Sequence, residues 1–252
     1  MPAGYDHSYV TLETKVGYYF SHDDGTKNPD GSGGGFSKDQ VVAFTIVDVY
    51  EDGTEVTRES IDKALINFNG ETPESQYNSR YHDPEIQPTI EDFTYEVPVY
   101  YGDMPLMDKD GNALSITAYI GVKGDADLNN LVDARDASAV LSYYTKIGST
   151  SEGYTPENTQ LSTSELVTGA NDPLDNLAAF LADVDKNEYD PENWSLTRAE
   201  RHTPDIGQAI DARDASAILT FYVYKGSFDN PLYNTKTDGE LWDIVVPGRF
   251  GN

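Results

Sequence analysis

The sequence predicts a chain of mixed α+β class, with an all-β, sandwich-like part over residues 1–122 and an all-α part over residues 123–252. Two observations lead to this division. Runs rich in Val, Ile, Thr, Tyr and Phe dominate the first half, and such runs favour strands. In the second half a decapeptide occurs twice in nearly identical form, and each copy has the apolar spacing of an amphipathic helix.

Five segments of the N-terminal part have the composition of strands, and turn signals separate them. Alternation of apolar and polar residues is clear in Val41–Tyr50, which indicates a strand buried on one face. A Gly-rich loop is expected at residues 30–35, and no helix of useful length is expected before Gly124. The expected strands are Tyr9–Lys15, Val41–Tyr50, Lys63–Phe68, Phe93–Tyr101 and Leu114–Val122.

The repeated decapeptide predicts two helices of the C-terminal part. It extends from Val132 to Leu141 and again from Ile210 to Leu219. Apolar residues at i, i+3, i+4 and i+7 give each copy one inner face. The expected faces are Ala137, Val140, Leu141 and Tyr144, and Ala215, Ile218, Leu219 and Tyr222. A third helix is expected at Pro173–Ala182, capped by Asp172.

The composition excludes several classes of function. The chain has 44 acidic and 17 basic residues and a net charge of -27, so nucleic acids and anionic membranes repel it. We therefore expect no nucleic acid partner and no direct membrane contact. The absence of Cys excludes disulfides, zinc–thiolate sites and Cys nucleophiles. The N-terminus lacks the pattern of a signal peptide, and any secretion signal is expected upstream of this segment.

A loop with the ligand spacing of an EF-hand precedes the first repeat. Oxygen-bearing side chains stand at loop positions 1, 3, 5, 9 and 12, where calcium loops carry their ligands. Position 7 is expected to contribute its backbone carbonyl, and Asn130 at position 6 to adopt the left-handed conformation that Gly usually has there. The expected ligands are Asp125, Asp127, Asn129, Leu131, Asp133 and Asp136.

A second loop precedes the other repeat, but a long insertion interrupts it. The entropic cost of closing a loop rises only slowly with its length. The two ends of this loop are therefore still expected to meet around one ion. The expected ligands are Asp183, Asp185, Asn187, Ala209 through its carbonyl, Asp211 and Asp214. The sequence therefore predicts two Ca2+ ions. Without them the like charges of each loop repel, and folding of the helical part is expected to depend on calcium.

A third acidic segment is expected to be a turn. Asp108, Asp110 and Asn112 have the spacing of loop positions 1, 3 and 5. However, Ile116 and Tyr119 stand at positions 9 and 12 and cannot bind a cation through their side chains.

The order of loop and helix, with no helix entering the first loop, resembles the dockerin family. The match covers Gly124–Ser138 and a second copy from Asp183 to Ser216, in which ligands, order and duplication agree. The resemblance implies a three-helix module with two F-hand calcium loops. Such a module docks onto a cohesin domain of a scaffoldin or cell-wall anchoring protein during cellulosome assembly.

The β-rich part directly upstream is similar to the X-module of the X-module–dockerin pairs that fix cellulosomes to cell surfaces. Insertions at Gly148–Asn171 and Glu188–Ala209 depart from the compact family pattern. They resemble a divergent type III dockerin of a rumen-bacterial, cellulose-binding anchoring protein. The resemblance thus implies a secreted, non-catalytic protein attached to the cell surface and serving plant polysaccharide degradation.

The resemblance also implies a partner surface on the two repeated helices. Small residues let a flat partner sheet approach closely, and Arg adds planar hydrogen bonding. An ordinary solvated helix face is the alternative, and both Arg residues could instead pair with their own loop carboxylates. The expected contacts are Ala134, Arg135, Ala137, Ser138, Leu141 and Ser142, with Ala212, Arg213, Ala215, Ser216, Leu219 and Thr220 in the second copy.

Two other functions stay open. The β-rich part could bind carbohydrate, or the chain could be the docking appendage of a secreted glycoside hydrolase. The sequence has no nucleophile elbow, His-rich metal site or phosphate loop, so no enzyme is expected within it. Tyrosines that could stack on sugars are Tyr18, Tyr19, Tyr77, Tyr81, Tyr95, Tyr100 and Tyr101.

The C-terminal run Leu241–Pro247 is apolar and resembles a strand. An exposed apolar run of this kind is unfavourable in water. We therefore expect it to pack against the β-rich part or against the first loop.

Overall fold

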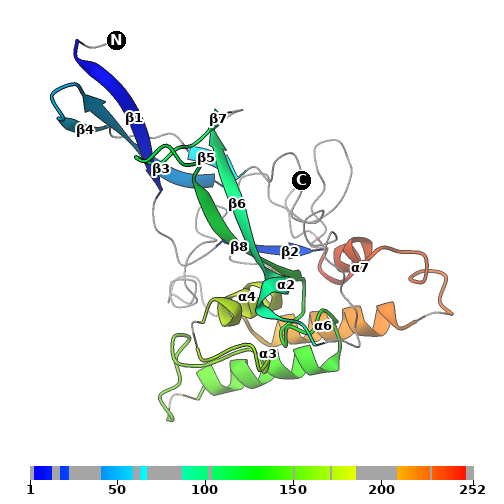
Figure 1. Ribbon diagram of the computed structural model, residues 1–252. Helices are drawn as coiled ribbons and strands as arrows, with labels where there is room; N and C mark the ends of the chain where they lie inside the picture. Colours follow the sequence, from blue (N-terminus) through cyan, green and yellow to red (C-terminus); the bar gives the residue numbers. More distant parts are fainter. Residues whose placement is uncertain are drawn as a thin grey trace.

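The computed structural model describes residues 3–12, 18–22, 41–58, 63–66, 87–101, 104–149, 151–170, 172–185, 209–227 and 229–247. These residues form the expected α+β arrangement, with the longer helices gathered at one end of a sheet (Figure 1). The strands are β1 (Tyr5–Leu12), β2 (Tyr18–His22), β3 (Val41–Tyr50), β4 (Glu55–Arg58), β5 (Lys63–Ile66), β6 (Thr94–Tyr101), β7 (Met104–Pro105) and β8 (Ser115–Val122). The helices are α2 (Ile90–Phe93), α3 (Ala134–Ile147), α4 (Pro173–Ala182), α6 (Ala212–Lys225) and α7 (Asp238–Val245).

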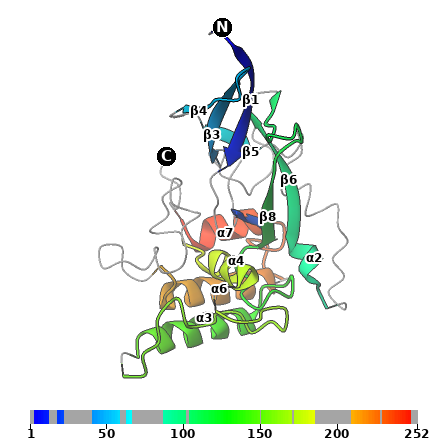
Figure 2. The same cartoon turned by 60° about the vertical axis from the view of Figure 1, so that its left-hand side comes forward.

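The described strands pair in one sheet, not in the two facing sheets of the expected sandwich. The strand order is β1-β3-β5-β6-β8-β2, with β4 paired to β3 and β7 paired to β6. All these pairs are antiparallel except β2 and β8, which run parallel. Helix α4, instead of a second sheet, packs on the β8–β2 end (Figure 2).

The sequence predicts some elements closely and misses others. Strand β3 and helix α4 have the predicted bounds, and β6 and β8 each begin one residue later than predicted. Strands β2, β4 and β7 were not predicted, and neither was helix α2. Helix α2 has four residues, too few to show a helical period, and depends on a capping box between Thr89 and Asp92. The Gly-rich segment 30–35 lies outside the described residues.

One hydrophobic core joins the sheet to the helices across the predicted boundary at residue 122. Tyr19 of β2 and Phe93, the last residue of α2, belong to the same buried cluster as Leu177 and Leu181 of α4. Gly121 leaves no room for a side chain, because a Cβ there would lie 2.6 Å from Leu181 Cδ1. The core of the helices therefore extends to the near end of the sheet, while a second cluster, which includes Val97, Val99 and Ile120, lies within the sheet.

Helices α3 and α6 pack side by side, and the predicted inner faces are correct in their first turn, where Ala137, Val140, Ala215 and Ile218 are buried, but not beyond it. Tyr143 and Phe221 are each 1% exposed, whereas Leu141, Leu219 and Tyr222 are exposed. The predicted faces were wrong at these positions, and Tyr144 is only half-buried. The buried stripe also includes an Asp, the third residue of each helix, directly before the predicted Ala.

The C-terminal run forms helix α7, not the expected strand, because Thr237 and Glu240 supply a capping box at its start. Its packing was predicted correctly. Trp242 is fully buried and stacks on Phe221 at 4.2 Å between ring centroids. The indole also lies against Gly124, at the entrance of the first loop, and Lys123 Nζ lies 5.2 Å from its ring centroid. Helix α7 therefore connects the first loop to α6.

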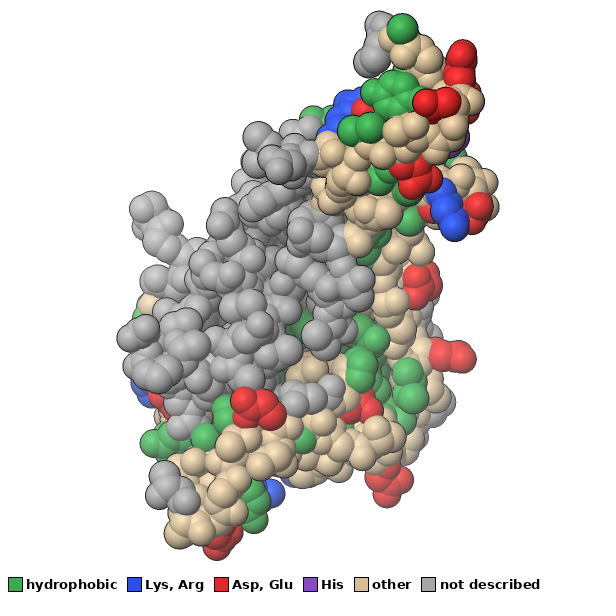
Figure 3. Space-filling model, turned by 90° about the vertical axis from the view of Figure 1, so that its left-hand side faces the viewer, with side chains coloured by type: hydrophobic (Ala, Val, Ile, Leu, Met, Phe, Trp, Pro, Cys, Tyr) green, Lys and Arg blue, Asp and Glu red, His purple; other side chains and the backbone are tan. Residues whose placement is uncertain are grey.

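The acidic excess of the chain lies partly on its surface. On the face drawn in Figure 3, Asp and Glu side chains stand at several separate points. Exposed charges of this kind remain hydrated and need no partner. Among the described residues, no helix has both the length and the apolar character of a membrane span.

We expect Trp242→Ala to lower the free energy of unfolding by about 3–5 kcal/mol, because it removes a fully buried indole from a packed core. Urea unfolding in excess calcium would measure this loss. The matched control is Ile244→Ala on the same helix, where the side chain is 40% exposed. We expect the control to cost less than about 1 kcal/mol. Equal losses in the two variants would contradict the packing of α7.

Candidate metal centres

Two groups of three Asp side chains lie at the starts of α3 and α6. The first site is Asp125, Asp127 and Asp136, and the second site is Asp183, Asp185 and Asp214. Within each site one carboxylate oxygen of each Asp lies within 4.8 Å of one oxygen of each of the other two. Asp125, Asp136 and Asp214 are fully buried. Three like charges in so small a buried volume are unfavourable unless a cation or bound protons neutralise them.

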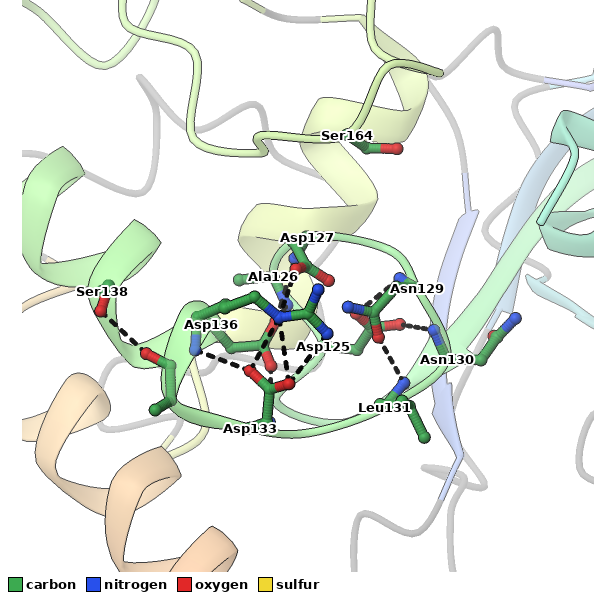
Figure 4. A network of polar contacts seen from close by, with 12 residues as sticks. Asp125, Ala126, Asp127, Asn129, Asn130, Leu131, Asp133, Asp136, Ser138 and Ser164 are labelled. Carbon is green, nitrogen blue, oxygen red and sulfur yellow. Dashed lines mark hydrogen bonds and ion pairs between the residues drawn. The ribbon is translucent and has the colours of Figure 1, made fainter. Parts of the chain in front are cut away.

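Asp136 ties the first loop to the start of α3 (Figure 4). Its Oδ1 accepts hydrogen bonds from the backbone N–H groups of Ala126 at 2.8 Å and Asp127 at 3.0 Å. Its Oδ2 accepts a third bond from Asp133 N at 2.8 Å, which closes the capping box of the helix. The carboxylate that is expected at position 12 is thus fixed in place by backbone donors.

Asp125 holds the turn in the middle of the same loop. Its two carboxylate oxygens accept hydrogen bonds from Asn129 N at 3.0 Å and from Asn130 N at 2.8 Å. Asn130 has a φ of 65°, the left-handed conformation expected at position 6. Leu128 also has a positive φ, of 56°. These two residues turn the backbone so that the side chains of alternate residues can point inward.

One oxygen of the first site has the properties of a free ligand atom. Asp127 Oδ1 is buried and accepts no hydrogen bond from the described residues. A buried carboxylate oxygen without a donor is costly, and an ion at the site removes that cost. The first site therefore fits a bound cation.

The second site repeats this geometry over a much longer loop. Asp214 Oδ1 accepts from Val184 N at 2.9 Å and from Asp185 N at 3.4 Å, and its Oδ2 accepts from Asp211 N at 2.9 Å. Ala126 and Asp136 are 10 residues apart, whereas Val184 and Asp214 are 30 apart. The insertion therefore leaves the two ends of the loop together, as expected. Of the other expected ligands, Ala209 is buried and Asn187 lies outside the described residues.

The two Arg residues pair with carboxylates of their own loops, which was the alternative to partner contact. Arg135 Nη2 lies 2.8 Å from Asp133, and its Nε lies 3.7 Å from Asp127. Arg213 lies 2.9 Å from Asp211. The hydrogen bond from Arg135 lowers the pKa of Asp133. Both Arg side chains nevertheless remain more than 60% exposed, so partner contact is still open to them.

Burial changes the protonation of the clustered acids. It raises the pKa of Asp136 to about 7. Burial, together with the negative charge of Asp136, raises the pKa of Asp125 well above its usual range. Burial and the charge of Asp183 do the same to the pKa of Asp214. A cation that binds these oxygens therefore displaces protons, and each site can hold one metal ion.

Most of the expected partner contacts lie on the outer faces of α3 and α6, but two do not. Ala137 and Ala215 are 8% and 7% exposed and belong to the core between the helices, so their expected partner contact is corrected. Each Ala directly follows the buried Asp of its helix, and both side chains face the core. The remaining expected contacts are exposed or half-buried: Ala134, Arg135, Ser138, Leu141, Ser142, Ala212, Arg213, Ser216, Leu219 and Thr220.

The other candidate features have structural explanations. The segment from Asp108 to Asn112 closes a turn, as predicted, in which Asp108 N donates to Asn112 O at 2.8 Å. Tyr19 and Tyr95 are buried in the core and cannot stack on a sugar, whereas Tyr101 is 44% exposed. Tyr100 is half-buried, and Tyr77 and Tyr81 lie outside the described residues. The tyrosines therefore do not form an open aromatic row in the described part of the chain.

The sequence did not single out a pocket beside the first site. It has a volume of about 550 Å³ and lies between the first loop, residues 87–89 and residues 163–166. Ser164 is shown near the site in Figure 4. Residues so far apart in the chain carry no shared local pattern, and the fold alone brings them together.

No protein-family model matches the chain, and no curated protein matches it. The two sites and the helices they begin are thus the basis for inferring a function.

In the cation-free protein we expect the free energy of unfolding to fall as the pH rises from about 5 to 8. The folded-state pKa of Asp136 is about 7, against about 3.9 in an unfolded chain. Between these values only the folded state binds this proton, so its stabilising effect is lost as the pH rises through about 7. Asp125 and Asp214 act in the same direction.

Urea unfolding in excess chelator at several pH values would measure this slope. Asp136→Asn cannot titrate and should weaken it, whereas Asp110→Asn, in the exposed turn, should leave it unchanged. A chelated protein that is more stable at pH 8 than at pH 5 would contradict the account of the sites.

Proposed function

We propose that this chain is a non-catalytic docking module that binds two calcium ions and, through α3 and α6, a cohesin domain. The observation that carries the proposal is the repeated geometry of the two sites. Each site is joined by its buried Asp to the start of one helix, and the two helices pack side by side. Matching side chains consequently face outward from both helices.

Calcium is supported by the donor atoms. Both sites offer Asp carboxylates, to which Asn129 and backbone carbonyls would add in the first loop, and calcium prefers six to eight such oxygens in an irregular loop. In the first site Asp125, Asp127, Asn129, Leu131, Asp133 and Asp136 would hold the ion, and in the second Asp183, Asp185, Asn187, Ala209, Asp211 and Asp214. The ion would neutralise the clustered carboxylates and tie each loop to its helix.

The outer helix faces have the composition of a binding surface. Leu141 and Leu219 stand at equivalent positions and are 46% and 45% exposed. The small residues Ala134 and Ala212 lie at the start of the same faces and are exposed. Apolar side chains beside small and polar ones are typical of the centre of a protein interface.

The two faces are not identical. Tyr222 and Val223 of α6 are 44% and 54% exposed, whereas the equivalent residues of α3 are the half-buried Tyr144 and the polar Thr145. The outer face of α6 is thus the more apolar one. We propose a single docking orientation in which α6 contributes more of the binding energy.

The biological setting follows from the resemblance of Gly124–Ser138 and Asp183–Ser216 to dockerins. We propose that docking attaches a cellulosome, or a cellulose-binding component, to the surface of a bacterial cell for polysaccharide catabolism. The protein would then act outside the cell, with its partner on a scaffoldin or cell-wall anchoring protein. A glycoside hydrolase carrying the module as an appendage would use the same surface.

We expect Ala134→Trp and Ala212→Trp to weaken cohesin binding unequally. A bulky side chain clashes in a fixed docking orientation, and the larger effect, at least about tenfold in Kd, is expected for Ala212→Trp because α6 has the more apolar face. Calorimetric titration against a panel of type III cohesins would measure both values. Chelation of calcium should abolish binding of the unchanged protein.

The control for this experiment is Val56→Trp, at an exposed position of β4, which lies at the end of the sheet away from the helices (Figure 1). We expect it to bind with unchanged affinity. If both single variants bind at full strength and only the double variant fails, docking occurs in two orientations. Binding that persists in excess chelator would contradict the role of calcium.

A further inference from the structure

A third helix, α4, also begins at an Asp cap, with Pro173 at its first position in place of the capping box of α3 and α6. Its third residue, Asp175, is fully buried, as are Asp136 and Asp214 at the third positions of the other two. Oδ1 of Asp175 accepts hydrogen bonds from two successive backbone N–H groups, those of Leu161 and Ser162, both at 2.9 Å. The Oδ1 atoms of Asp136 and Asp214 also accept from two successive N–H groups.

The residue that caps each helix also corresponds. Asp172 Oδ1 accepts a bond from Leu174 N at 2.9 Å. Asp133 Oδ1 accepts the equivalent bond from Arg135 N at 2.7 Å. Both caps stand three residues before the buried Asp of their helix.

The middle of the loop shows a further match. Leu166 N donates to Ser164 Oγ at 3.3 Å, as Leu131 N donates to Asn129 Oδ1 at 2.8 Å. Together these bonds align this segment with the first loop, with four additional residues between positions 7 and 9. Positions 1, 3, 5, 7, 9 and 12 correspond to Gln160, Ser162, Ser164, Leu166, Asp172 and Asp175.

The chemistry at the first three positions differs from that of the two acidic sites. Gln160, Ser162 and Ser164 replace Asp125, Asp127 and Asn129 of the first loop, which removes two negative charges. Gln160 Nε2 donates to Ser162 O at 2.7 Å. Gln160 is exposed, whereas Asp125 of the first loop is fully buried, and no carboxylate stands at position 1 or 3 of this loop to repel Asp175.

We infer that residues 160–182 are a third loop–helix unit, the middle unit, whose loop is closed by Gln160 and Ser side chains instead of by a cation. The inference rests on the proposed function of the other two loops. A loop closed in this way would keep α4, though not α3 and α6, attached to the sheet without calcium. Leu181 packs against Gly121, Gly124 N donates to Leu181 O at 2.9 Å, and Phe180 lies beside Tyr19. Helix α4 is thus the fixed support on which α3 and α6 assemble.

Restoring the ligands of the first loop should create a third calcium site. The variant Gln160→Asp, Ser162→Asp, Ser164→Asn places the residues of the first loop at positions 1, 3 and 5. Native mass spectrometry in calcium should then count three ions per chain, against two in the unchanged protein. The control Ser151→Asp, Thr163→Asp adds the same charge at exposed positions and should count two.

The outcomes separate the two proposals. An unchanged protein that binds no calcium overturns the proposed function. If the unchanged protein binds two ions and the triple variant binds no third, or fails to fold in calcium, the middle unit is not built as inferred.

Two further measurements test the cation-free loop directly. Asp175→Asn keeps an oxygen that can accept both backbone bonds, so we expect the count to stay at two, whereas a fall to one overturns the inference. Hydrogen exchange of the full chain in chelator should be at least tenfold slower in α4 than in α3 and α6. Equal exchange in the three helices overturns the role of α4 as a calcium-independent support.

Discussion

Three carboxylates must share a small buried volume at the start of each of two helices, and the helical part depends on how their charge is neutralised. Asp136 and Asp214 are held by backbone donors on both oxygens, so they cannot turn out to solvent without breaking the start of α3 or α6. Protons can neutralise them only at a pH below their raised pKa. A divalent cation that binds their oxygens neutralises the same charge by displacing those protons.

The same two Asp residues determine the packing around them. Because each is buried at the third position of its helix, the inward stripe runs through Tyr143 and Phe221 and leaves Leu141 and Leu219 outside. Phe221 in turn supports Trp242. The exposed faces proposed for partner binding are therefore a consequence of the register that the buried acids impose, and loss of an ion would disturb loop, helix and surface together.

The local features of this chain could be predicted from sequence, and the long-range ones could not. The cluster of Asp125, Asp127 and Asp136, the left-handed Asn130 and the helix Pro173–Ala182 depend on nearby residues, and the structure has all three. The parallel pairing of β2 with β8 and the core shared across residue 122 depend on distant segments. The sequence did not predict the middle unit. Its backbone hydrogen bonds match those of the two acidic loops, but its residues at the ligand positions do not.

Calorimetric titration of the chelated chain with calcium, with the helical circular dichroism signal followed in parallel, tests the central claim most directly. The account predicts that two ions bind per chain and that the helical signal rises as they bind, since ions that bind only the folded state stabilise it. The variant Asp136→Asn, Asp214→Asn should bind neither ion tightly. A chain that takes up no calcium, or that takes up two ions with no gain in helix or stability, would contradict it.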